Sequence, residues 1–465
     1  MKKGQEYIGT IEEMKFPNKG IVNYEEVRED GVITTKVTIP GGILGQKIKF
    51  LLTKKKSKKC EGRVIDILEK SQYEDKNPVC PKFGICGGCT YQTMSYGNQL
   101  EVKKNMVKSI LDEVIKEDYD FQGIIGSPEE LEYRNKMEYS FGDQYKGGEL
   151  CLGLHKKGSF YDIVNTNECK IVNDDYNRIL DVILEYFKSQ NIPYYHKMSK
   201  EGYLRHVLIR RARRTGEIII AIVTTTTMDV DFKILCDRLL ELNLLGDIVG
   251  IMHIYNDGLA DMVRSDKTEI LYGRDYIYEE ILGLKFKISL FSFFQTNSLG
   301  AEKLYEKARE YVGETKDKLV FDLYSGTGTI TQMLAKVAKK VVGVEIIEEA
   351  VDAAKENADL NGLENCDFYA GDVLKVIDEI EDKPDLIVLD PPRDGINPHA
   401  LDKIINYGVE RMVYISCKPT SLARDLIVLQ ERGYKVLKAC AVDMFPGTYH
   451  VETVVLMSKV GVEYA

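Results

Sequence analysis

No run of apolar residues in this 465-residue sequence is long enough to cross a membrane. The first residues, Met1 to Glu6, also lack the apolar stretch of a secretion signal. We find no internal repeat and no low-complexity segment. These absences predict a globular protein that stays in the cytoplasm, away from membranes.

Cysteine spacing of the kind found in disulfide-rich proteins is also missing. Cys80, Cys86 and Cys89 lie close together, and the other cysteines of the ten are scattered along the chain. In a reducing compartment this pattern predicts metal binding or catalysis rather than disulfides.

A net positive charge is also lacking, because 73 Asp and Glu outnumber 63 Lys and Arg and give a formal net charge of −10. This disfavours indiscriminate binding to nucleic acid. The basic residues are nevertheless concentrated in two places. Residues 1–70 are locally basic and include the run Lys54–Lys59. Residues 196–214 hold a second basic island, made of Lys197, Lys200, Arg205, Arg210, Arg211, Arg213 and Arg214. Two such islands predict RNA binding at chosen places, although lysines on solvated loops would give the same pattern.

The length predicts several domains. Residues 1–70 show five short β segments between turns, which predicts a small OB-like β-barrel. Residues 71–284 predict a central α+β domain that carries the cysteine cluster, a helix over about 96–115 that packs on the C-terminal domain, and a hairpin around Arg214–Gly216. Residues 285–465 repeat buried strand, loop and helix, which predicts a Rossmann-like, doubly wound parallel sheet. The fold class is therefore multidomain α/β.

A glycine turn at Gly326 and Gly328 follows the first strand of this sheet. Glycine lets the backbone approach a ligand beyond the strand's carboxyl end. A dinucleotide fingerprint needs a third glycine where this chain has Thr331. Glu345, at the end of the next strand, is placed for a ribose, and Asp372 for adenine. The pattern predicts an adenosyl ligand rather than NAD, although a glycine turn without any ligand would look the same.

Two further motifs, Asp390–Arg393 and Ser416–Pro419, end the fourth and fifth strands. A free cysteine is most often inert core sulfur. Pro419, however, breaks the chain away from the strand and leaves the Cys417 thiol facing the crevice. Arg393 and Lys418 are expected to favour the thiolate.

Methylation of uracil at carbon 5 requires such a thiolate. Carbon 5 is a poor nucleophile until a thiolate adds to carbon 6 and turns the ring into an enolate. The methylated carbon still holds a proton, which a base must remove. Glu452, at the start of the final apolar strand, is our candidate base, because burial raises the pKa of a carboxyl. Taken alone, it would be read as a surface carboxylate.

Seven motifs, in family order over residues 80–457, resemble the RNA uridine-5-methyltransferase family, the bacterial enzymes that make 5-methyluridine in 23S rRNA and tRNA. They are Cys80-x5-Cys86-Gly87-Gly88-Cys89-x2-Gln92, Tyr133-Arg134-Asn135-Lys136, Phe293-Phe294-Gln295-x-Asn297, Asp322-Leu323-Tyr324-x-Gly326-x-Gly328, Asp390-Pro391-Pro392-Arg393, Ser416-Cys417-x-Pro419 and His450-Val451-Glu452-Thr453.

The resemblance implies that Cys417 is the nucleophile and Glu452 the base. It also implies the residues that contact S-adenosylmethionine or lie where cofactor and uracil meet: Gln295, Tyr324, Glu345 and Asp390. Lys418 replaces the asparagine expected after the nucleophile, which puts in doubt how the flipped base is held. Ser325 replaces a cysteine of the glycine loop.

The resemblance further implies that Cys169 joins Cys80, Cys86 and Cys89 as a fourth ligand, with Cys151 and Cys60 as rivals. Four thiolates suit either tetrahedral zinc or an iron–sulfur cluster. Only one CxxC pair is present, and the family favours a four-iron four-sulfur cluster that helps to fold the central domain.

The N-terminal barrel resembles the TRAM domain, an RNA-binding module, and a uridine in folded RNA must leave its stack to reach Cys417. The candidate RNA contacts are Arg134, Arg205, Arg210, Arg211, Arg213 and Arg393. We expect a monomer that modifies 23S rRNA, because the barrel and the cysteine cluster accompany the ribosomal branch. The alternatives are a tRNA uridine-5-methyltransferase, an amino-group methyltransferase, since Asp-Pro-Pro motifs also serve exocyclic nitrogens, and a non-catalytic RNA-binding iron–sulfur protein.

Overall fold

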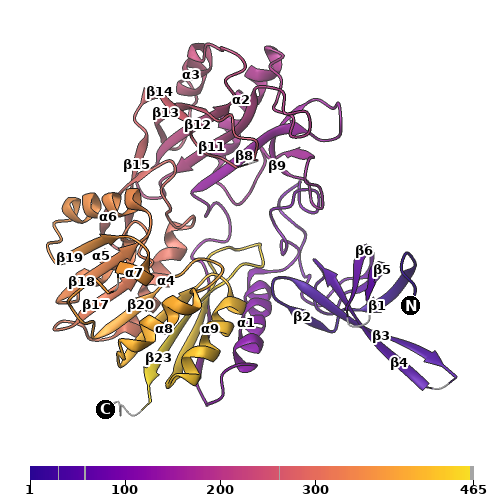
Figure 1. Ribbon diagram of the computed structural model, residues 1–465. Helices are drawn as coiled ribbons and strands as arrows, with labels where there is room; N and C mark the ends of the chain where they lie inside the picture. Colours follow the sequence, from indigo (N-terminus) through magenta and orange to yellow (C-terminus); the bar gives the residue numbers. More distant parts are fainter. Residues whose placement is uncertain (30, 57–58, 261, 377, 461–465) are drawn as a thin grey trace.

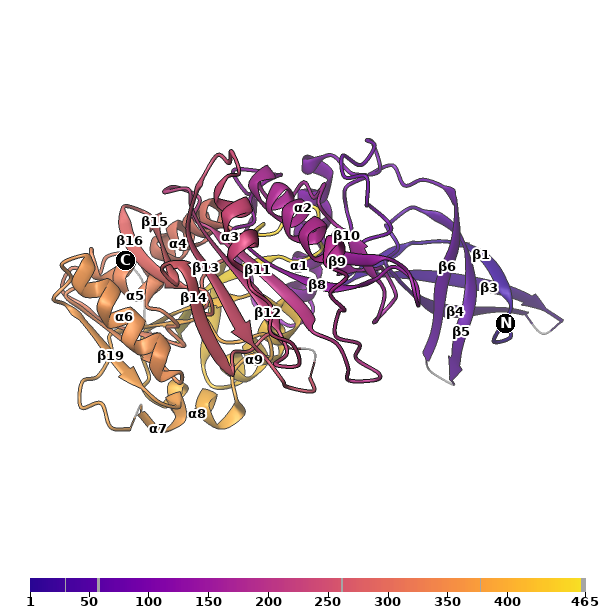
Figure 2. The same ribbon diagram turned by 90° about the horizontal axis from the view of Figure 1, so that it is seen from above.

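The computed structural model describes residues 1–29, 31–56, 59–260, 262–376 and 378–460. Over these residues the chain is a mixed α/β protein built on several separate sheets. Figure 1 shows an indigo N-terminal part beside the magenta central part and the orange-to-yellow C-terminal part, and Figure 2 shows the three in a row. Within the described ranges, no helix has the length and apolar character needed to span a membrane.

The N-terminal part is a six-stranded sheet in the order β1-β5-β6-β4-β3-β2. Alternate residues such as Val37, Ile39, Ile48 and Phe50 point inward and form its core. Five of its strands match the predicted segments, whereas the short β2 was not predicted. Its assignment as an OB-like TRAM barrel stays a prediction, and residues 57–58 of the basic run lie outside the described residues. The strands are β1 (Glu6–Thr10), β2 (Glu13–Lys15), β3 (Lys19–Arg28), β4 (Gly31–Pro40), β5 (Lys47–Lys56) and β6 (Lys59–Glu69).

The C-terminal part is an eight-stranded sheet in the order β19-β18-β17-β20-β21-β23-β22-β7. Strands β17 to β21 are parallel, as the alternating pattern predicted, and β23 runs antiparallel to β21 and β22. Chain order reverses between β17 and β20, which is where open sheets of this kind form a ligand crevice. The strands are β17 (Leu319–Leu323), β18 (Lys340–Glu345), β19 (Cys366–Ala370), β20 (Leu386–Leu389), β21 (Arg411–Ser416), β22 (Tyr434–Val442) and β23 (Glu452–Lys459).

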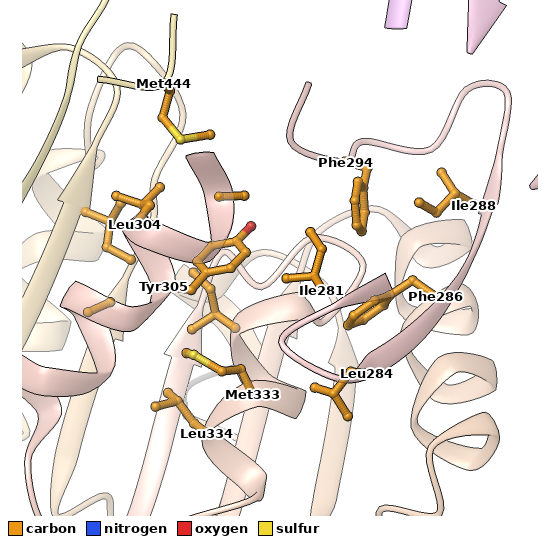
Figure 3. Close-up of a cluster of buried hydrophobic side chains, with 14 of the residues drawn as sticks. Ile281, Leu284, Phe286, Ile288, Phe294, Leu304, Tyr305, Met333, Leu334 and Met444 are labelled. Atoms are coloured by element: carbon orange, nitrogen blue, oxygen red, sulfur yellow. The ribbon is translucent and has the colours of Figure 1, made fainter. Parts of the chain in front are cut away.

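Helices cover both faces of this sheet. One apolar core includes α4 and α5, and a second core on the other face includes α8 and α9. Part of the first core is drawn in Figure 3. The helices are α4 (Ser298–Val312), α5 (Thr329–Ala335), α6 (Glu348–Leu360), α7 (Val373–Val376), α8 (Pro398–Asn406) and α9 (Pro419–Glu431).

The segment between the N-terminal and central parts contributes a helix and a strand to the C-terminal part. Helix α1 (Tyr96–Asp112) lies where the periodicity predicted it and packs against α9 and β7. Strand β7 (Asp120–Ile125), which was not predicted, pairs with β22 at the edge of the C-terminal sheet. Lys103 of α1 forms a fully buried ion pair with Asp443, with 2.7 Å between Nζ and Oδ1.

The central part is a seven-stranded sheet in the order β10-β9-β8-β11-β12-β13-β14, followed by a separate β15–β16 hairpin. The predicted hairpin is confirmed, because β11 and β12 pair antiparallel on either side of Gly216. The elements are β8 (Lys136–Asp143), β9 (Leu150–His155), β10 (Ile163–Asn165), α2 (Asp174–Ser189), β11 (Leu204–Arg211), β12 (Glu217–Thr224), α3 (Lys233–Leu240), β13 (Asp247–Tyr255), β14 (Lys267–Gly273), β15 (Tyr276–Ile281) and β16 (Leu284–Ser289).

Candidate active site

The glycine loop between β17 and α5 lies at the carboxyl edge of the C-terminal sheet. Tyr324 has φ +70°, a left-handed conformation that is costly for tyrosine and is concentrated at functional sites. The carboxylate of Glu345, the last residue of β18, accepts hydrogen bonds from the backbone N–H groups of Gly326 and Ile347, both at 3.0 Å. The structure therefore brings the predicted Glu345, Tyr324 and Gly326 together.

The two glycines of this loop serve different needs. A Cβ at Gly328 would lie 2.7 Å from the Phe368 ring, so this glycine permits close packing of α5. A Cβ at Gly326 would meet nothing closer than Phe293, at 3.9 Å, so the space above it is open. The predicted Asp372 is exposed at the same edge, where its charge raises the pKa of Tyr324.

Polar atoms without partners lie beside the open loop. Asp322 is fully buried, and burial raises its pKa to about 7. Thr331 Oγ1 donates to its Oδ2 at 2.6 Å. Asp322 Oδ1 and Ser325 Oγ, however, have no hydrogen-bond partner among the described residues. Buried polar atoms of this kind are usually satisfied, so the loop fits a polar ligand.

Cys417 and Glu452 meet because β21 and β23 are antiparallel. Ser416 pairs with Thr453, so the residue that follows β21 lies beside the first residue of β23. Glu452 is buried, and burial together with the Asp390 carboxylate raises its pKa to about 8. The pKa of Asp390 is itself raised to about 7 by burial. A cysteine thiol, a protonatable carboxyl and a second acid thus gather at the crevice.

The expectation that basic neighbours favour the Cys417 thiolate holds in direction for Arg393, but not for Lys418, and other causes outweigh Arg393. Burial, then Glu452 and Asp390, raise the pKa of the half-buried thiol to about 11, and Arg393 lowers it only in part. Lys418 points elsewhere, with its Nζ 3.9 Å from Asp394 Oδ1. The thiol is therefore protonated at neutral pH until something changes its surroundings.

Gln295 is held at the crevice through its backbone. The Asn135 side-chain amide donates to the Gln295 carbonyl oxygen at 2.9 Å, which joins two motifs far apart in the sequence. The Gln295 side chain also lies near the hydroxyl of Tyr305, a buried residue of α4, and lowers its pKa. Burial, followed by the charges of Asp390 and Glu452, outweighs this effect and raises the pKa of Tyr305 above its usual range.

Sequence reasoning missed Tyr305, which has no motif of its own. Figure 3 shows its ring packed among apolar side chains that include Leu304 and Met333. Only the fold reveals that its hydroxyl reaches the acidic cluster. We would otherwise have read it as a core aromatic at helical spacing.

A sequence model described as tRNA (Uracil-5-)-methyltransferase matches residues 95–460. The chain belongs to this family. It is 49% identical over 455 residues to an uncharacterized RNA methyltransferase of Clostridium tetani, with 98% of each chain covered. It is 50% identical over 459 residues to another of Clostridium acetobutylicum, with 99% of each covered.

The tRNA (uracil-54, C5)-methyltransferase of Pyrococcus abyssi, solved in complex with S-adenosyl-L-homocysteine, has the same fold. Its TM-score is 0.75 at 24% sequence identity, and the comparison covers 97% of this chain and 100% of that one. The expected membership of the RNA uridine-5-methyltransferase family is therefore confirmed, and the chain is an RNA-modifying enzyme.

Most of the candidate RNA-binding arginines of this uracil-5 methyltransferase are hydrogen-bonded to other parts of the protein. Arg205 is buried and donates to the carbonyl oxygens of Asn256, Gly258 and Ala260. Further partners inside the protein are Ser289 O and Ser292 O for Arg210, Asp175 for Arg211 and Glu129 for Arg213. A phosphate contact needs exposed donors, which the buried Arg205 and Arg210 do not offer. Arg211 and Arg213 are partly exposed, and their contact with RNA stays a prediction.

Arg134 is half-buried and its Nε donates to the Lys136 carbonyl oxygen at 3.1 Å, whereas Arg393 is placed differently. Arg393 is exposed beside Cys417 and Glu452. Burial, followed by the charges of Arg393, Lys103 and Arg134, lowers the pKa of the neighbouring His450 to about 4. His450 is therefore neutral near pH 7, and the positive charge at the site's rim comes from the two arginines. They remain candidates for contacts with RNA or uracil.

The four predicted cysteine ligands of the methyltransferase share one neighbourhood. The pKa of Cys89 is raised to about 12, mainly by burial and also by Cys169, Cys86 and Cys80. The rivals Cys151 and Cys60 lie on β9 and β6, and Cys151 interacts with Lys188 and Asp143 rather than with the cluster. Over the described residues, however, no group of three or more His, Cys, Asp or Glu side chains converges as a metal site would.

Proposed function

We propose that this enzyme methylates carbon 5 of a uridine in RNA, with Cys417 as covalent nucleophile and Glu452 as the base. The observation that carries the proposal is the meeting of a half-buried thiol with a buried, protonatable carboxyl at the carboxyl edge of the sheet. Neither group has an evident structural use there. Each suits one half of the reaction.

S-adenosylmethionine fits the crevice as the methyl donor and supplies an electrophilic methyl group on a sulfonium. Support comes from the open space above Gly326, the fixed carboxylate of Glu345 and the unpartnered Asp322 and Ser325 atoms. The acidic pair Asp390 and Glu452 suits the positive charge of a sulfonium. The Pyrococcus abyssi relative was solved with the demethylated product of the same donor.

The residues act in two stages. The Cys417 thiol first gives its proton to water, and the sulfur adds to carbon 6, so that the electron pair of the 5,6 double bond moves to the carbonyl oxygen. Carbon 5 of the resulting enolate takes up the methyl group. The Glu452 carboxylate then removes the proton from carbon 5, the double bond forms again, and the thiolate leaves.

A matched pair of cysteine variants tests this chemistry. Cys417→Ala should abolish methyl transfer and the covalent adduct with 5-fluorouridine RNA, yet still bind S-adenosylmethionine. Cys366→Ala, a half-buried cysteine at the other end of the same parallel sheet, should keep both. Full methylation by Cys417→Ala would instead favour an amino-group methyltransferase. A wild-type chain that binds no S-adenosylmethionine would favour a non-catalytic RNA-binding protein.

We propose 23S rRNA as the substrate. The N-terminal barrel-like sheet and the cysteine neighbourhood support it, because the family resemblance links both to the ribosomal branch. The family description and the Pyrococcus abyssi enzyme name tRNA instead. Incubation of unmodified 23S rRNA and tRNA with labelled donor, followed by mapping of the product, separates the two. A monomer in the cytoplasm remains our expectation.

We further propose that Cys80, Cys86, Cys89 and Cys169 hold a four-iron four-sulfur cluster that helps to fold the central part. The thiol chemistry of this donor set suits iron or zinc. Anaerobic purification should yield bound iron and inorganic sulfide, and Cys169→Ser should lose them while Cys151→Ser keeps them. Zinc in place of iron, or equal metal content in both variants, would contradict the assignment.

A further inference from the structure

Two aromatic rings lie exposed on the loop between β9 and β10. Phe160 is 65% exposed and Tyr161 53% exposed, and Met198 from a distant loop is 69% exposed beside them. The Tyr161 hydroxyl contacts Met198 Sδ at 3.4 Å, so the two loops form one surface. Burying such side chains against a partner is favourable. The His155 ring stacks on Phe160 with 6.1 Å between the ring centroids, and all three side chains still expose more than half of their surface.

The rings are arranged as a corner. Their centroids are 5.3 Å apart and their planes meet at 86°. A flat group that stacks on one ring therefore presents its edge to the other, and both geometries are favourable for aromatic pairs.

Positive charge surrounds this corner. Lys197 Nζ lies 4.9 Å from the Phe160 ring centre. Lys157 and Lys200 are exposed on the same two loops. Lys197 and Lys200 belong to the basic stretch 196–214, and Lys157 adds an exposed cation from the loop between β9 and β10.

The loop between β9 and β10 is hydrogen-bonded to the cysteine segment, residues 80–91. The Lys157 N–H donates to the Ile85 carbonyl at 2.7 Å, and the Gly87 N–H donates to the His155 carbonyl at 3.0 Å. On its other side the cysteine segment is tied to the loop before Glu452, because the N–H groups of Thr90 and Tyr91 both donate to the Gly447 carbonyl. The exposed rings are thus held in a fixed relation to the candidate base.

We propose that the aromatic corner, made of Phe160, Tyr161, Met198 and Lys157, stacks an unpaired base of the RNA substrate while the exposed Lys157 binds an adjoining phosphate. Flat aromatic faces interleaved with cations are the means by which proteins bind single-stranded RNA. The charge of the corner favours a polyanion over an apolar or basic protein partner. This inference rests on the proposed RNA substrate but not on the covalent mechanism.

The absence of tryptophan from the chain permits a direct test. Phe160→Trp introduces a single indole, whose fluorescence should be quenched when the full-length protein binds an oligouridylate of about 12 nucleotides. Tyr145→Trp, at another exposed ring that is 67% exposed, provides the matched control. An indole at position 160 that responds no more than the control would overturn the proposal.

Affinity measurements separate stacking from charge. Phe160→Ala should weaken oligouridylate binding about tenfold with an unchanged salt dependence. Lys157→Gln should lower the slope of log affinity against log salt by about 0.7. Tyr145→Ala should change neither. If Phe160→Ala and Lys157→Gln both keep the wild-type affinity and salt dependence, the aromatic corner does not bind RNA, and a protein partner becomes the alternative.

The outcomes also distinguish this inference from the proposed function. If the Phe160→Trp protein methylates uridine at carbon 5 but its indole does not respond to RNA, only the proposed base stacking at the aromatic corner is contradicted. An indole quenched by RNA in a protein that makes no 5-methyluridine contradicts only the mechanism.

Discussion

The carboxylate of Glu452 raises the pKa of the Cys417 thiol beside it, second only to burial. Two groups that the reaction needs as anions therefore oppose each other's ionisation, and the nearby Arg393 offsets this only in part. A cationic methyl donor would relieve the opposition further. We infer that the site becomes reactive only when its ligands are in place.

Replacing the base should trap the reaction halfway. Glu452→Gln cannot take the proton from carbon 5, so we expect turnover to fall by about 100-fold or more while a covalent RNA adduct accumulates. Denaturing gels with labelled RNA would detect the adduct. Glu431→Gln, an exposed glutamate at the end of α9, should behave as the wild type. Adduct-free loss of activity in Glu452→Gln would assign the carboxyl an earlier role.

Single-turnover rates should rise with pH. The pKa of Glu452 is about 8 and that of Cys417 about 11, and both act as anions, so the reactive fraction grows from pH 6 towards pH 9. Asp390→Asn removes a negative neighbour of both, which lowers their pKa values and should move the profile to lower pH, whatever its effect on the maximum rate. A profile unchanged in position would show that Asp390 does not control their ionisation.

The stability of the ligand-free enzyme should depend on Asp322. Its folded pKa of about 7 lies above the ordinary value of 3.8, so the folded state retains the proton more tightly than the unfolded state does. Stability from this group is present below about pH 4 and is lost as pH rises to 7. Asp322→Asn should therefore raise the free energy of unfolding by a few kcal/mol at pH 8 and leave it almost unchanged at pH 4. Urea titrations at both values would check this.

The buried pair of Lys103 and Asp443 can be tested by comparing a single variant with a double variant. Lys103→Met leaves a carboxylate buried without its cation, which should cost roughly 3–5 kcal/mol. Lys103→Met combined with Asp443→Asn removes both charges but keeps an acceptor for the Phe445 N–H, which lies 3.0 Å from Asp443 Oδ1. Most of the loss should then be recovered in urea unfolding. A double variant as unstable as the single one would argue against charge pairing as the cause.

Sequence patterns predicted those features that depend on local order. The parallel sheet and the β11–β12 hairpin follow from hydrophobic periodicity. Glu345, Asp390 and Cys417 fall at one edge because Glu345 ends a parallel strand and the other two directly follow one, and that edge is where such sheets bind ligands.

Other features depend on contacts that a linear reading does not contain. Arg210 looked like an RNA contact because charge counting ignores the carbonyl oxygens of Ser289 and Ser292 that bind it. The raised pKa of Cys417 arises from burial and from Glu452, 35 positions away by number but adjacent in space. Strand β7 forms because β22 offers it an open edge.

The long separation between Lys103 and Asp443, 340 positions, has a consequence for synthesis. At 5–20 residues per second, roughly 20–70 s pass between the two residues on the ribosome. During that interval Lys103 of α1 lacks the buried site and the carboxylate partner that it has in the folded protein, and β7 lacks the strand β22 with which it pairs. A nascent chain of this enzyme should therefore depend on chaperones until its last strands emerge, and truncated products should be degraded rather than accumulate.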